Sequence, residues 1–89
     1  MFSVLYVDDE TGLLDIGKIF LESLGNFSID TAPSACIAIS MMNEKKYDAI
    51  VSDYQMSEMD GIEFLRRVRA SGSDIPFILF TGRGREEVV

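Results

Sequence analysis

The 89-residue chain contains no histidine and no tryptophan, only one cysteine and only two prolines. Without histidine, any chemistry that needs an imidazole has to be supplied by a partner. The single cysteine, Cys36, cannot form a disulfide within the chain. We interpret Cys36 as a small buried hydrophobe, typical of a protein in a reducing compartment.

Basic residues are also scarce, since eight of them stand against fifteen acids and give a net charge of −7. No run of lysine or arginine forms a cationic stripe, so direct binding to nucleic acid is not expected. Apolar runs such as Phe77 to Phe80 are far too short to cross a bilayer. The first residues lack the cationic start of a secretory signal and lead into acids at positions 8–10. We therefore expect a cytoplasmic protein.

The composition, with 47% hydrophobic and 26% charged residues, is that of a globular protein, and the length suits one domain spanning 1–89. Stretches rich in β-forming residues alternate with stretches in which apolar residues recur every three or four positions. This alternation predicts an α/β fold with a parallel sheet and helices on both of its faces. The expected strands cover 2–7, 27–32, 48–53 and 75–80, and the expected helices begin near Thr11, Pro33 and Gly61.

Three segments carry finer expectations. The first helix is expected to keep Lys18 and Glu22 on its outer side, and the third to place Phe64 at the margin of its buried stripe. Residues 86–89 are interpreted as the first turn of a further helix. The predicted inward stripe of the first helix consists of Leu13, Ile16, Gly17, Phe20, Leu21 and Leu24.

The polar residues that end the predicted strands are Asp8 and Asp9 after the first, Asp53 on the third and Thr81 after the fourth. Because parallel strands lie about 4.8 Å apart and end at the same edge, these carboxylates can share a ligand. Acids at strand ends are common in solvated loops, but their joint placement favours a site. Hard oxygen ligands without histidine or a cysteine pair predict Mg²⁺ or Mn²⁺, and Asp53 is the candidate reacting group.

Four motifs then identify a resemblance that covers essentially the whole chain. They are V-L-Y-V-D-D-E at 4–10, D-A-I-V-S-D-Y-Q-M at 48–56, M-D-G-I-E-F-L at 59–65 and I-P-F-I-L-F-T-G at 75–82. The chain resembles the receiver domain of two-component response regulators. Its closing F-T-G-R-G-R-E-E-V-V is similar to receivers of methanogenic archaea, often the first module of sensor kinases.

The resemblance implies a flavodoxin-like, doubly wound sheet with strand order 2-1-3-4. It implies that Asp53 accepts a phosphoryl group from a phosphohistidine on a histidine kinase or phosphotransfer protein, so that the domain is not an enzyme but promotes its own phosphorylation and slow dephosphorylation. Asp9, Asp53 and the Gln55 backbone carbonyl would bind Mg²⁺, with Asp8 acting largely through metal-bound water. Thr81 matches the switch hydroxyl that moves toward the phosphoryl oxygens.

Two departures from the family pattern are present. Ser57 stands where proline is usual, which is expected to loosen the loop beside Asp53. Nothing follows Val89, so the receiver is expected to be incomplete, lacking the fifth strand with its phosphate-binding lysine and the last helices. The fourth strand would then be an edge that is apolar on both faces. We predict association, for example a homodimer, through this strand or the uncovered face.

Two other functions remain open. A degenerate or truncated receiver can act as a protein-interaction or dimerisation module without productive phosphorelay. A phosphohydrolase with an aspartate nucleophile resembles a strand ending in Asp-x-Asp-x-Thr, whereas Asp8, Asp9, Glu10 and Thr11 have a different spacing. The Gly82-x-Gly84 sequence gives only weak support to nucleotide binding.

Overall fold

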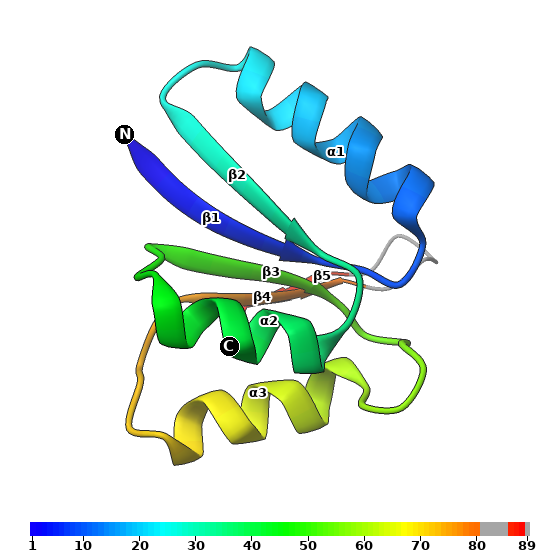
Figure 1. Cartoon of the computed structure of the whole chain (residues 1–89), viewed down its shortest axis with the longest axis vertical. Coiled ribbons are helices and arrows are strands. Elements are labelled where there is room, and N and C mark those ends of the chain that lie inside the picture. Colours follow the sequence, from blue (N-terminus) through cyan, green and yellow to red (C-terminus); the bar gives the residue numbers. More distant parts are fainter. Residues whose placement is uncertain (81–85, 89) are drawn as a thin grey trace.

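The computed structural model describes residues 1–80 and 86–88 (Figure 1). Apart from its last segment, the alternation of strands and helices expected from the sequence is confirmed. The elements are β1 (Phe2–Val7), α1 (Thr11–Ser23), β2 (Phe27–Ala32), α2 (Ala35–Glu44), β3 (Ala49–Asp53), α3 (Gly61–Ala70), β4 (Phe77–Phe80) and β5 (Glu86–Val88).

The strands form one sheet in the order β2-β1-β3-β4-β5. The first four are parallel, which confirms the predicted doubly wound order 2-1-3-4. In Figure 1, α1 covers one face of the sheet, and α2 and α3 cover the other. No helix within 1–80 or 86–88 is long and apolar enough to span a membrane.

The larger core lies between the sheet and the pair α2 and α3, around the fully buried Leu5, Val7 and Ile50. Phe64 on α3 was expected at the margin of this core but is fully buried. Its ring packs edge-on against Phe77 of β4, with the ring centroids 5.3 Å apart. The marginal position predicted for Phe64 is therefore wrong, because β4 supplies an aromatic partner directly opposite this residue.

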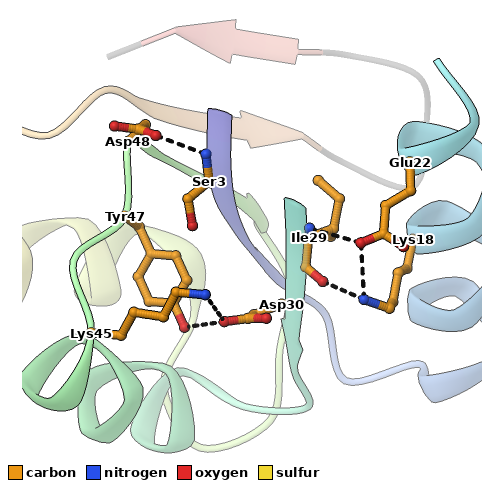
Figure 2. A network of polar contacts seen from close by, with 8 residues as sticks. All are labelled: Ser3, Lys18, Glu22, Ile29, Asp30, Lys45, Tyr47 and Asp48. Carbon is orange, nitrogen blue, oxygen red and sulfur yellow. Dashed lines mark hydrogen bonds and ion pairs between the residues drawn. The ribbon is translucent and has the colours of Figure 1, made fainter. Parts of the chain in front are cut away.

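Helix α1 is rotated relative to the sequence-based prediction. Leu14 is its buried residue, and Lys18 and Glu22, which were expected to point outward, bond to the backbone of Ile29 in β2 (Figure 2). The ammonium of Lys18 donates to the Ile29 carbonyl, and Glu22 accepts from the Ile29 N–H at 3.0 Å. The predicted stripe is mostly exposed within the described part of the chain, at Leu13, Ile16, Phe20 and Leu24.

A second polar group ties β2 to the connection between α2 and β3 (Figure 2). The Tyr47 hydroxyl donates to the Asp30 carboxylate at 2.7 Å, and the Lys45 ammonium donates to the same oxygen at 3.1 Å.

Helix α2 begins after Ser34, whose hydroxyl accepts a hydrogen bond from the N–H of Ile37. Cys36 in its first turn is exposed, so the expectation that it is buried is wrong.

The last described segment differs from the sequence-based expectation. Residues 86–88 form the strand β5, antiparallel to β4, rather than the first turn of a helix. Phe80 pairs with Glu86 and Ile78 with Val88, so β4 is not the edge of the sheet. Pairing with residues 86–88 gives hydrogen-bond partners to backbone N–H and C=O groups of β4 that would otherwise be unpaired. This gain outweighs the local helical preference of residues 86–88.

Candidate functional site

The acidic residues predicted from the sequence meet at the carboxyl edge of the sheet. Strand β1 ends at Val7, directly before Asp8 and Asp9, and β3 ends at Asp53. Val7 pairs with Ser52, so the chain leaves both strands at the same level. One carboxylate oxygen from each of Asp8, Asp9 and Asp53 lies within 4.8 Å of the others.

Asp8 is buried with 1% of its surface exposed, and its two oxygens differ in their surroundings. Oδ1 accepts a hydrogen bond from the Glu10 N–H at 2.9 Å. Oδ2 is buried and has no hydrogen-bond partner within residues 1–80 and 86–88. Burial raises the pKa of this carboxyl, and the charges of Asp53 and Asp9 raise it further. The Asp8 carboxylate is therefore compensated at Oδ1 only, and its buried Oδ2 is not.

Asp53 is half-buried at the end of β3. Burial is the main cause that raises its pKa, and the charge of Asp9 adds to it. Its Oδ1 accepts a long hydrogen bond, 3.4 Å from the Gln55 N–H. An orphaned buried oxygen among three carboxylates fits a hard divalent cation, which takes oxygen ligands and offsets their mutual repulsion. The residues present thus suit Mg²⁺ or Mn²⁺.

Asp9 is exposed and is held by the loop that follows β3. Both the N–H and the hydroxyl of Ser57 donate to Asp9 Oδ2, each at 3.0 Å. The expectation that Ser57 loosens this loop is therefore wrong, because Ser57 ties the loop to the end of β1. Sequence reasoning missed this contact, although a residue with two donors in place of a proline was a usable signal.

The family model of the response regulator receiver domain matches residues 4–89 of the chain. The chain belongs to this family. It is 34% identical over 84 residues to the response regulator Rre1 of Synechocystis, covering 92% of this chain and 36% of Rre1. The chain thus spans only about a third of the length of that relative.

Solved receiver structures agree with the fold. TrrA of Thermotoga maritima in complex with Mg²⁺–BeF is 31% identical, with a TM-score of 0.84 over 91% of this chain and 70% of TrrA. The structure of histidine kinase ThkA in complex with the response regulator TrrA contains a chain that matches with a TM-score of 0.86 and 29% identity. That match covers 96% of this chain and 72% of the other. The fold is therefore the flavodoxin-like receiver fold, and its acidic cluster is typical of a magnesium-binding receiver site.

A receiver is a phosphoacceptor signalling module rather than an enzyme in the ordinary sense, as expected from the sequence. In this receiver, Gly61 lets α3 start directly against the end of β3. A Cβ at Gly61 would lie 2.5 Å from the Asp53 carbonyl oxygen, and the Gly61 N–H donates to the Tyr54 carbonyl at 2.8 Å. Close backbone approach is therefore the reason for glycine at the start of α3.

The predicted roles of two other site residues stay predictions. Thr81, the predicted switch hydroxyl, lies outside the described residues. Its neighbour Phe80 pairs with Asp53, and the Tyr54 N–H donates to the Phe80 carbonyl at 2.7 Å. Gln55 is exposed on the loop after Asp53, and the metal-binding role of its carbonyl stays a prediction.

Proposed function

We propose that this receiver binds Mg²⁺ or Mn²⁺ and accepts a phosphoryl group on Asp53. The observation that carries the proposal is the meeting of three carboxylates, one of which has a buried oxygen without a partner. Asp8, Asp9, Asp53 and the Gln55 carbonyl would hold the cation, with Asp8 acting largely through bound water. When bound, the cation supplies positive charge that lets an anionic phosphoryl group approach these carboxylates.

Asp53 acts as the nucleophile in this proposal. One of its carboxylate oxygens forms a bond to phosphorus while the bond from phosphorus to the imidazole nitrogen of the donor breaks, leaving the phosphate on Asp53. The donor imidazole then takes up a proton. The Thr81 hydroxyl would donate a hydrogen bond to the new phosphoryl oxygens. Its movement toward them would change the interaction surface of the receiver.

The phosphohistidine would come from a histidine kinase or a phosphotransfer protein. This chain has no histidine of its own, and the similar receiver TrrA forms a complex with the histidine kinase ThkA. Such an exchange between two proteins supports a cytoplasmic location. Because Rre1 extends far beyond the matched region, we also propose that residues 1–89 are one incomplete receiver module of a longer protein.

A second function, as an interaction or dimerisation module without productive phosphorelay, is favoured by one observation. The outer side of α1 exposes apolar side chains, among them Ile16 and Phe20. This apolar side of α1 offers a route for a homodimer that differs from the predicted pairing through β4, which β5 already pairs. Self-association that weakens in Phe20→Ser, without phosphorylation of the chain, would favour this second function.

The test is phosphorylation by a small acyl phosphate. Incubation with acetyl phosphate and Mg²⁺ should add one phosphoryl group to the intact protein, as measured by mass spectrometry, and chelation of Mg²⁺ should abolish the addition. Asp53→Asn should remove it completely, whereas Asp15→Asn on the outer side of α1 should not. If neither this chain nor a version extended past Val89 is labelled, or if Asp53→Asn is labelled equally, the proposal is wrong.

A further inference from the structure

We infer that Ser57 is a positioning residue for the metal ligand Asp9, and that it strengthens Mg²⁺ binding by the receiver. The inference rests on the proposed function, because it concerns the affinity of the same cation site. It assigns a role to a residue that belongs to neither of the acid-bearing strands. Ser57 lies in the loop between β3 and α3, four positions after Asp53.

The geometry shows two donors that converge on one acceptor atom. The backbone N–H and the hydroxyl of Ser57 both lie 3.0 Å from Asp9 Oδ2. Proline, the residue that resembling receivers usually have here, carries neither an N–H nor a hydroxyl and could make neither hydrogen bond. Both hydrogen bonds therefore depend on the residue type at position 57.

These hydrogen bonds act on the least constrained member of the cluster. Asp9 is exposed, and repulsion from Asp8 and Asp53 favours a rotation of its side chain away from them. The two donors hold Asp9 where its carboxylate lies within 4.8 Å of the other two. Because both donors use Oδ2, neither of them occupies Oδ1. Hydrogen bonds to a ligating carboxylate orient it in this way and commonly raise metal affinity.

The loop is itself fixed, so Ser57 can hold Asp9 rather than merely follow it. Glu58 has a left-handed φ of 70°, and the Met59 N–H donates across it to the Ser57 carbonyl at 2.8 Å. Met59 is buried against the core beneath the loop. A non-glycine residue persists in this conformation only where the surrounding structure holds it. Burial of Met59 therefore anchors the loop that presents Ser57.

The experiment is a Mg²⁺ titration of the receiver and four variants by isothermal titration calorimetry. Ser57→Thr keeps both donors, Ser57→Ala keeps only the N–H, and Ser57→Pro keeps none. Ser40→Ala makes the same change as Ser57→Ala on the exposed side of α2 and is the matched control. We expect unchanged affinity for Ser57→Thr and Ser40→Ala, and a loss that grows from Ser57→Ala to Ser57→Pro. Ser57→Pro should weaken Mg²⁺ affinity about tenfold. This value is near the lower end of the losses seen when a hydrogen-bond partner of a metal ligand is removed, because Ser57 and Asp9 are exposed.

A second readout separates positioning from a general structural effect. The rate of labelling by acetyl phosphate should fall in Ser57→Ala at low Mg²⁺ and return to the wild-type rate at saturating Mg²⁺. Equal Mg²⁺ affinity in all Ser57 variants, or tighter binding in Ser57→Ala, would overturn the inference while leaving the proposed function intact. A wild-type receiver that binds no Mg²⁺ would overturn both. If Ser57→Pro does not fold, the pair of Ala and Thr variants decides the question.

Discussion

Two groups of acids in this receiver have opposite surroundings. On β2, Asp30 accepts hydrogen bonds from Tyr47 and Lys45 (Figure 2). The Tyr47 hydroxyl is the main cause that lowers the pKa of Asp30, and Lys45 lowers it further. At the carboxyl edge, Asp8 has one oxygen without a partner, and burial and neighbouring acids raise its pKa. The same residue type is stabilised in one place and destabilised in the other.

The difference indicates which acids serve the fold and which serve a ligand. Asp30 is compensated by groups of the chain itself and joins β2 to the connection between α2 and β3. The cluster of Asp8, Asp9 and Asp53 has no cation within the described residues close enough to form an ion pair. Buried acids with raised pKa values are a feature of functional sites. Such a site keeps its acids together for function even though their charged forms lower the stability of the folded protein.

Among the variants that test this difference between the two groups of acids, Asp8→Asn should change the free energy of unfolding most. Without divalent cations, this change should stabilise the receiver by about 1–3 kcal/mol, since it removes a buried charge whose Oδ2 has no partner. The new amide can also donate to the neighbouring carboxylates. The measurement is urea unfolding in the presence of a chelator.

The control for this prediction is Asp15→Asn, which removes the same charge from an exposed position on α1. Addition of Mg²⁺ should raise the melting temperature of the wild-type receiver and of Asp15→Asn, but have a smaller effect on Asp8→Asn. A metal-free Asp8→Asn variant that is less stable than wild type would show that Asp8 is structurally compensated after all.

A smaller effect of opposite sign is expected in the β2 group from Tyr47→Phe. This change removes the 2.7 Å hydrogen bond to Asp30 and should destabilise the receiver by about 1 kcal/mol, because Asp30 keeps Lys45 and contact with water. Tyr54→Phe makes the same change on an exposed side chain and should leave the free energy of unfolding unchanged. Equal unfolding curves for the two variants would contradict the prediction.

The acidic site could be predicted because its geometry follows from topology. Strands that alternate with helices form a parallel sheet, whose carboxyl ends share an edge, so Asp8, Asp9 and Asp53 had to meet there. For the contact of Ser57 with Asp9 the sequence offered only the signal of a donor-bearing residue where proline is usual, and it did not reveal the partner, because the loop contains the left-handed backbone of Glu58. Loop conformations of this kind are determined by burial further along the chain.

The orientation of α1 shows where periodicity alone is insufficient. Apolar residues occur on two sides of this helix, one with Leu13 and Phe20 and the other with Leu14. The structure buries the second side, since Gly17 there leaves room for the Tyr6 ring and a Cβ would collide with it. Sequence spacing could not reveal this contact between β1 and α1. Likewise, 86–88 form a strand because pairing with β4 overrides local propensity.

The smallest expected effect, and the sharpest separation of the two groups, comes from pH. An acid with a raised pKa destabilises the folded state in its charged form, and this loss is absent below the ordinary value of 3.8. The advantage of metal-free Asp8→Asn over wild type should therefore be full at neutral pH and shrink as the pH falls through the raised pKa of Asp8 toward 3.8.

For Asp30 the sign is reversed, because its folded-state pKa is lowered. Its stabilisation is present above the ordinary value of 3.8 and is lost only as the pH falls below that value, through the lowered pKa. The deficit of Tyr47→Phe should thus stay nearly constant as the pH falls from neutral to 3.8, while the gain of Asp8→Asn declines before the pH reaches 3.8. Urea unfolding of both variants across this range, in chelator, measures the two slopes. Parallel slopes would show that the two groups of acids are compensated alike, and would remove the physical basis for treating the carboxyl edge as a cation site.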